Sequence, residues 1–224
     1  MRVALMLPWL AIAVSAQAKE SRCFGTPADG RLEGGVPLAY EGANFSPYSA
    51  LGVGLGRSYV HSRVASTVAA AYAALAVALP RTVFVYGESG WEDGGRIRPH
   101  RTHQNGLSVD FMVPVRDADG ASVPLPTGVT NKFGYAIEFD AQARHGTLTV
   151  DFDALAAHLH ALHVAARAQG IDIRRVIFER AWLPKLYATR HGPYLREHVE
   201  FMRTDAWVRH DEHYHVDFRV RCAR

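Results

Sequence analysis

Two histidine-rich segments, about a hundred residues apart, constrain the fold of this chain more than any other feature. The first, residues 99–111, reads PHRTHQNGLSVDF, and the second, residues 210–218, reads HDEHYHVDF. Together they hold five of the twelve histidines, and each also contains a carboxylate. Imidazole and carboxylate are the ligands that zinc prefers in catalytic sites, where three protein ligands leave one position open for water. We therefore expect a fold that brings the two segments together around one zinc ion, as in a hydrolase.

The spacing within each segment supports a shared site. On a strand, side chains two residues apart project to the same face, so His213 and His215 can reach a common point, with His210 on the approach to it. In the first segment a short turn can fold Asp110, on the strand that follows, back beside His103. We read these residues as the candidate metal site.

Two simpler interpretations compete, a structural zinc site and a set of hydrogen-bonded core histidines. A structural zinc is usually closed by cysteines, and neither Cys23 nor Cys222 has a histidine at ligand spacing. Glu88 and Glu92, near the glycine-rich loop, could orient ligands or substrate amines, but we favour solvated loop acids. Three histidines on one helical stretch are read as packing or solvent-facing residues: His158, His160 and His163.

The N-terminus has the composition of a secretory signal over residues 1–18. Arg2 precedes an apolar run over residues 3–14, and Ala16-Gln17-Ala18 fits a small-x-small cleavage site. The run is short for a transmembrane helix, which takes roughly 20 apolar residues, and no later stretch qualifies. We expect an exported, periplasmic protein with one mature domain over 19–224; an uncleaved anchor is the alternative.

Export bears on the two cysteines. In an oxidising compartment Cys23 and Cys222 are most simply read as a disulfide that ties the N-terminal segment to the last strand, the alternative being two free thiols. Closing so long a loop contributes on the order of 4 kcal/mol in the chain-entropy model. Basic residues are scattered, 25 against 22 acidic ones, without an arginine-rich strip, so nucleic acid binding has no support.

Periodicity and turn signals predict one α+β domain, an antiparallel sheet with helices against it. Residues 19–56 should be irregular and 116–148 a long loop with a hairpin. Asp151 or Asp153 should cap the second helix, and Gly192-Pro193 should break the third. Helices are expected at 58–79, 151–169 and 182–197, and strands at 81–86, 107–115, 173–178 and 213–220.

The motifs resemble a known group. His-x6-Asp followed far downstream by His-x-His is similar to the LAS metallopeptidases, which include lysostaphin-type, D-Ala-D-Ala peptidase and hedgehog-type zinc folds. His100, the His210-Asp211-x-His213-x-His215 pattern and the later Cys222 resemble penicillin-insensitive murein endopeptidases. The wider text, CFGT at 23–26 and NGLSVDFMVPV at 105–115, is similar to TagX-type peptidoglycan endopeptidases that accompany type VI secretion.

This resemblance implies a LAS/hedgehog-type fold and a role for each site residue. Some relatives use a glutamate base, which Glu212 formally fits, but on a strand it would point away from His215, so His213 is preferred. Asp217 is either a partner of a ligand imidazole or an ordinary strand carboxylate. The implied roles are zinc ligation by His103, Asp110 and His215, base or oxyanion stabilisation by His213, and cleft walls at His100 and His210.

The resemblance also implies a function. We expect a zinc endopeptidase that cuts the peptide cross-links of peptidoglycan and remodels the wall, in contact with envelope components of a secretion system. A carboxypeptidase or amidase on the same site, and a non-catalytic zinc-containing wall-binding protein, are the alternatives. The bond that is cut and the identity of the metal are left open by these motifs.

Overall fold

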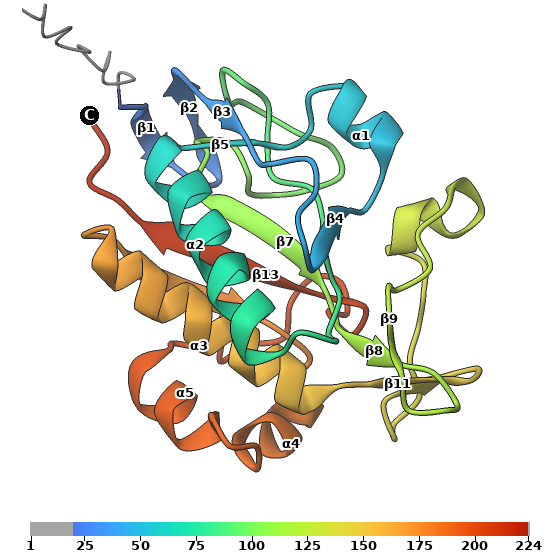
Figure 1. The fold of residues 1–224 in the computed structure, drawn as a ribbon. Coiled ribbons are helices and arrows are strands. Elements are labelled where there is room, and N and C mark those ends of the chain that lie inside the picture. The colour runs from blue at the N-terminus through green and yellow to red at the C-terminus, as the bar shows by residue number, and fades with distance from the viewer. Residues whose placement is uncertain (1–19, 224) are drawn as a thin grey trace, which may run out of the picture.

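The computed structural model describes residues 20–223. At its centre lies a five-stranded sheet in the order β12-β13-β7-β6-β4, antiparallel except for the edge pair β4–β6 (Figure 1). This confirms the predicted α+β class. The strands are β4 (Phe45–Pro47), β6 (Phe84–Tyr86), β7 (Ser108–Met112), β12 (Asp172–Ile177) and β13 (His213–Arg219).

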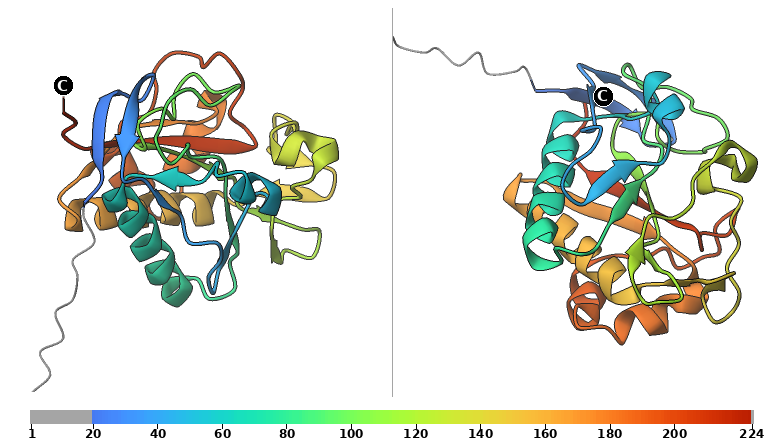
Figure 2. Two further views of the ribbon diagram at one scale, coloured as in Figure 1. Left: turned by 90° about the horizontal axis from the view of Figure 1, so that it is seen from above. Right: turned by 45° about the vertical axis from the view of Figure 1, so that its right-hand side comes forward.

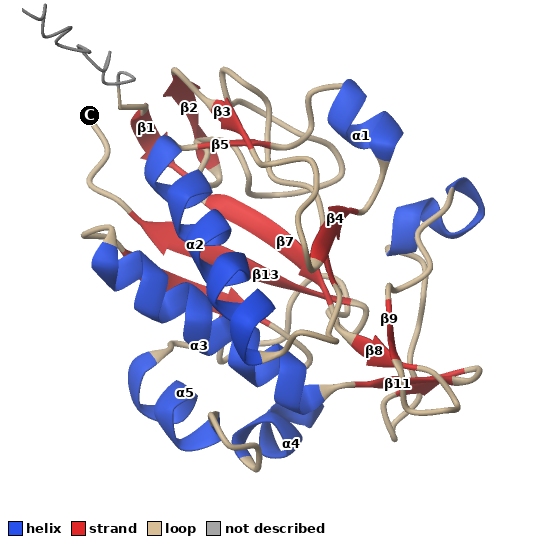
Figure 3. Ribbon diagram, in the orientation of Figure 1, coloured by secondary structure: helices blue, strands red, loops and turns tan. Residues whose placement is uncertain are grey.

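Helices cover one face of this sheet. In Figures 1 and 3, α2 (Ser62–Ala78) passes over β7 and β13 and packs against α3 (Phe152–Ala168), and the short α4 (Leu183–Tyr187) and α5 (Gly192–His198) pack around α3. Asp151 caps α3 as predicted, because its side chain accepts a hydrogen bond from the Ala154 amide at 3.0 Å.

Alternation along the central strands separates the core from the other face. Phe111 on β7 and Tyr214 on β13 face the helices, where both rings contact His158 of α3. Their neighbours in sequence must then project to the opposite side of the sheet. Asp110 and His215 therefore share the helix-free face. Figure 2 shows the sheet and the helices against it from two further directions.

Smaller elements complete the domain. A second sheet has the order β10-β11-β8-β9, and β3 pairs with β5. The predicted hairpin in 116–148 is confirmed by β8 and β9. The bounds are β3 (Val36–Pro37), α1 (Ala50–Gly54), β5 (Tyr59–Val60), β8 (Val115–Arg116), β9 (Ser122–Val123), η1 (Val129–Gly134), β10 (Arg144–His145), β11 (Leu148–Val150) and η2 (Arg180–Trp182).

Two expectations about turns were wrong. Residues 19–56 are not simply irregular, since β1 (Arg22–Thr26) and β2 (Asp29–Glu33) form an antiparallel hairpin around a turn at residues 27–28. Gly192-Pro193 does not break a helix but begins α5, because proline is favoured in the first helical turn, where its missing N–H costs no hydrogen bond. The break lies before it, at residues 188–191.

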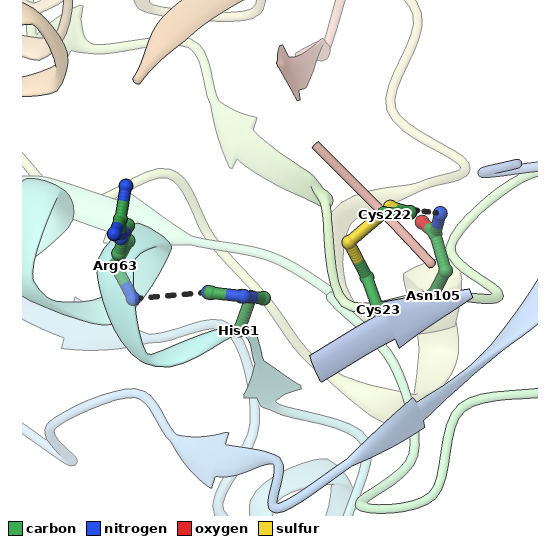
Figure 4. Close-up of a disulfide and its surroundings, with 5 residues drawn as sticks. All are labelled: Cys23, His61, Arg63, Asn105 and Cys222. Carbon is green, nitrogen blue, oxygen red and sulfur yellow. Dashed lines mark hydrogen bonds between the residues drawn. A yellow bond between two sulfur atoms is a disulfide. The ribbon is translucent and has the colours of Figure 1, made fainter. Parts of the chain in front are cut away.

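The predicted disulfide is confirmed. Cys23 on β1 is bonded to Cys222 just after β13, across a sequence separation of 199 (Figure 4). The Ala223 amide also donates to the Cys23 carbonyl at 2.9 Å, so the chain end lies beside β1. Nearby, His61 caps α2 by accepting a hydrogen bond from the Arg63 amide (Figure 4).

One part of the export prediction concerns residues that the structure describes. Within residues 20–223, helices are too short or too polar to cross a bilayer. The predicted signal at 1–18 lies outside the described residues. Both the cleavage site and the boundary of the mature domain stay predictions.

Replacing Cys222 by Ser should lower the free energy of unfolding by about 4–5 kcal/mol, because the unfolded chain of the variant, without the cross-link, gains the conformational freedom of a very long loop. For a domain of this size the midpoint of thermal unfolding falls by roughly 10–20 °C. Urea and thermal denaturation of the oxidised proteins measure both. A reductant should remove the difference in stability between the variant and wild type. Equal stability of the two proteins under oxidising conditions would contradict the structural role of the bond.

Candidate metal centre and its surroundings

The register of two strands brings the second histidine segment against the first. Asp110 on β7 lies opposite His215 on β13, and Ser108 opposite Asp217. The Oδ1 atom of Asp110 is 2.9 Å from Nδ1 of His215. Asp110 has almost no exposed surface, so the two sequence segments meet around a buried carboxylate.

His103 reaches the same carboxylate from the loop before β7. Its φ is 70°, and the turn that follows contains Gly106 at φ 74°. A Cβ on Gly106 would lie 2.8 Å from the backbone nitrogen of His61, so the chain needs glycine there. The result is that Nε2 of His103 lies 3.2 Å from Oδ1 of Asp110.

The protonation of His103 makes this contact a place for a cation. Its Nδ1 lies 2.8 Å from the Ser89 carbonyl, which can only accept, so Nδ1 carries the ring proton. Burial lowers the pKa of His103, which keeps the ring neutral and leaves a lone pair on Nε2. That buried nitrogen has no hydrogen-bond partner among the described residues and faces an ionised oxygen. Two acceptors 3.2 Å apart repel each other unless a proton or a metal cation lies between or beside them, so a cation can bind at this contact.

His215 has a carboxylate on each side. Its Nε2 lies 2.7 Å from Oδ1 of Asp217, which also accepts a hydrogen bond from Ser108 and pairs with Arg175 through its other oxygen. Burial alone would lower the pKa of His215, but Asp217 and Asp110 raise it to about 10. Asp217 holds Nε2–H and Nδ1 is directed at Asp110, so without a metal Nδ1 carries a proton as well, which a metal ion would displace to bind there.

Three further side chains surround the second oxygen of Asp110. The Tyr135 hydroxyl donates to Oδ2 at 3.1 Å, while Nδ1 of His100 and Nε2 of His213 lie 3.7 Å and 3.9 Å from it. Burial opposes ionisation of Asp110, but the imidazoles around it hold its pKa well below the usual range. The carboxylate therefore stays charged.

His100 is held by a buried acid that was misjudged from the sequence. Glu88 is only 8% exposed, so the expectation of a solvated loop acid was wrong. It accepts hydrogen bonds from Arg57 and Tyr48, and its Oε2 is 2.5 Å from Nε2 of His100. Burial alone would raise its pKa, but His100 and Arg57 lower it to about 2. Glu92 is exposed, as expected.

Glu212 also differs from its expected placement. The strand parity that would point it away from His215 does not apply, because β13 begins only at His213. Its Oε1 lies 2.8 Å from Nδ1 of His213, and burial raises the pKa of Glu212 to about 8. Burial also lowers the pKa of both His213 and His210 to about 4. Their rings lie 4.6 Å apart, centroid to centroid.

An open cleft of about 710 Å³ leads to these groups. Its walls come from residues 99–102, from 132–138 and from 207–213, with Arg175, Ile177 and Met202 contributing from β12 and beyond. His103 lies behind the wall, fully buried. Of the site residues predicted from the sequence, those that line the cleft are His100, Asp110, His210, His213 and His215.

One trio of side chains among residues 20–223 could hold a metal ion. Ligand atoms of His100, His103 and Asp110 lie within 4.8 Å of one another. The trio expected from the motifs shares two of these residues and has His215 in place of His100. His100 and His215 each have a carboxylate next to one ring nitrogen and direct the other nitrogen toward Asp110. That nitrogen lies 2.9 Å from the Asp110 carboxylate in His215 and 3.7 Å from it in His100.

Five contributing side chains were not singled out in the sequence: Tyr48, Arg57, Ser108, Tyr135 and Arg175. Tyr135 and Arg57 lie in segments without regular periodicity, and only the β7–β13 register could have identified Ser108. The histidines read as packing residues are confirmed in that role for His158, which bonds the Tyr214 hydroxyl in the core, and for His163, which bonds Tyr194. His160 is half-buried and stacks on His191.

Comparison with known proteins agrees with this geometry. Residues 23–224 match a protein family described as penicillin-insensitive murein endopeptidase. A search of curated proteins found no match. Because the family match includes both histidine segments, both cysteines and the whole described fold from Cys23 onward, this chain belongs to the penicillin-insensitive murein endopeptidases and is a peptidase.

Proposed function

We propose that the protein is a zinc-dependent endopeptidase that hydrolyses the peptide cross-links of peptidoglycan in the periplasm. The single observation that carries the metal dependence is the buried, unpartnered Nε2 of His103, 3.2 Å from Oδ1 of Asp110. The family supports murein as the substrate. The disulfide is typical of an oxidising compartment, which supports the periplasmic location, the signal at 1–18 and the mature domain at 19–224.

The proposed ligands are His103, Asp110 and His215. Ser89 and Asp217 hold the far nitrogens of the two imidazoles, so both rings are oriented before an ion arrives. When bound, a zinc ion polarises the scissile carbonyl and lowers the pKa of water to about 7. One carboxylate among three ligands keeps the net charge of the site positive.

His213 is proposed to move the proton. It lines the cleft, Glu212 holds its Nδ1, and burial keeps it neutral near pH 7, able to take a proton from the nucleophile and deliver it to the leaving amine. His100 and His210 form cleft walls beside it. The similarity to TagX-type enzymes supports a further proposal, that wall opening serves assembly of a type VI secretion machine.

Replacing His103 or Asp110 by Ala should remove both the metal and the activity, with a fall in turnover of at least about a thousandfold. Elemental analysis measures bound metal, and mass spectrometry of digested muropeptide dimers measures cleavage and separates endopeptidase from carboxypeptidase products. His198→Ala, at an exposed histidine outside the cleft, is the matched control and should behave as wild type. Full activity of a metal-free Asp110→Ala protein would contradict the proposal.

His213→Ala should retain the metal yet lower kcat by about 10²–10⁴, because it removes a proton carrier rather than a ligand. Glu212→Gln should cost only about tenfold, since Gln can still hydrogen-bond the His213 ring. Steady-state kinetics beside metal content distinguish these effects. A larger loss in Glu212→Gln than in His213→Ala would instead identify Glu212 as the base.

Asp217→Asn should weaken metal affinity by about 10–100-fold, because Asn holds the His215 ring without a negative charge. Competition with a chromophoric chelator measures this affinity. Asp172→Asn is a suitable control, since Asp172 lies on the neighbouring strand and bonds His163 outside the cleft. Equal affinity of the two variants would show that Asp217 is an ordinary strand carboxylate.

A further inference from the structure

The cleft is lined by more cations than its metal centre requires. Among the described residues, the basic side chains along its walls are Arg101, Lys132, Arg175 and Arg209. A positive charge beside a substrate cleft is either neutralised by a neighbouring carboxylate or available to a ligand. The cations that have no carboxylate partner are therefore the ones that a substrate can use.

Two of these cations are neutralised by the protein. Arg175 pairs with buried Asp217 at 2.7 Å. Arg209 pairs with Glu179 at 3.0 Å and with Asp211 at 3.2 Å. Both guanidinium groups therefore have a structural role, in holding the strand β12 and the 207–213 wall.

Arg101 and Lys132 are different. Both are exposed, and within residues 20–223 neither lies within 4.0 Å of a carboxylate oxygen. Arg101 lies 5.0 Å over the ring of half-exposed Trp207, which fixes its position while leaving its N–H donors free. Glu138, also exposed at the cleft, forms no ion pair with either of them in this part of the chain.

The backbone that carries Lys132 is held in an unfavourable conformation. Lys132 and Phe133 have φ values of 52° and 59°, and Gly134 follows at 98°. The Asn131 side chain pins this turn, because its Oδ1 accepts hydrogen bonds from the amides of Gly128 and Gly134, each at 2.9 Å. Left-handed non-glycine residues in succession are rare and concentrate at ligand sites, where they fix a side chain against its own backbone preference.

We propose that Arg101 and Lys132 recognise a carboxylate of the wall peptide beside the scissile bond. The proposal rests on the endopeptidase function above and names the chemical group of the substrate that the cleft recognises. A diamino acid with two carboxyl groups that contributes its side-chain amine to a cross-link carries a free carboxylate on the same carbon as that amine, next to the bond that is cut. Two unpaired cations at the cleft would bind that anion with charge-assisted hydrogen bonds, and the free acid would be preferred over its carboxamide.

The test compares two synthetic cross-linked peptide dimers, one with the free carboxylate and one with a carboxamide at that position. Wild type should show a KM for the acid about tenfold lower than for the amide, with similar kcat. Arg101→Gln and Lys132→Met should each raise KM for the acid about three- to tenfold and leave the amide unchanged. Added salt should raise the wild-type KM for the acid and have little effect on the double variant.

Matched controls separate recognition from folding and from general charge. Lys132→Arg keeps the charge and should keep the preference for the acid. Arg81→Gln removes an exposed positive charge away from the cleft and should have no effect on either substrate. Undiminished cleavage of the amide by the double variant would show that it folds.

Three results would overturn the proposal. If wild type cleaves acid and amide with equal KM, or if the variants affect both substrates equally, carboxylate recognition fails while the endopeptidase function stands. If wild type with its metal cleaves neither dimer, the proposed function fails and this inference fails with it.

Discussion

The hydrogen-bonded register between β7 and β13 is the constraint on which the rest of the structure depends. It sets His215 against Asp110 and Asp217 against Ser108, so that the two halves of the candidate site meet on one face of the sheet. The same register turns Phe111 and Tyr214 toward the helices. A slip of one residue would exchange the two sets, moving imidazoles into the apolar core and aromatic rings into the cleft. Packing of the apolar core and assembly of the candidate site therefore depend on the same strand register.

The fully buried carboxylate of Asp110 explains why so many partners gather there. An isolated ionised carboxylate is costly to bury, and the protein surrounds this one with imidazoles and a tyrosine hydroxyl. The contact between Asp110 and His103 lacks a hydrogen-bond donor, since Oδ1 of Asp110 and Nε2 of His103 each offer a lone pair. A divalent cation would satisfy both groups, and the proposed ligand set follows from that need. The disulfide lies at the other end of β13, where it fixes the strand to β1.

Much of this was predictable from sequence, because regular elements follow periodicity. The ranges of α2, α3, β12 and β13, the Asp151 cap and the shared face of His213 and His215 all follow from local rules. Glu88 and Tyr135 were not predictable, because their partners come from loops whose course no local pattern fixes. Glu212 was misplaced for a related reason, since a one-residue difference in where a strand begins decides which way a side chain points.

Anomalous diffraction at the zinc edge from crystals of the zinc-loaded protein tests the central claim most directly. The account predicts one strong peak bonded to His103, Asp110 and His215, with Asp217 still holding the far nitrogen of His215. A peak bonded to His100 with His215 left free would contradict the proposed ligand set. Crystals that take up no zinc at the Asp110 carboxylate would contradict the metal centre itself.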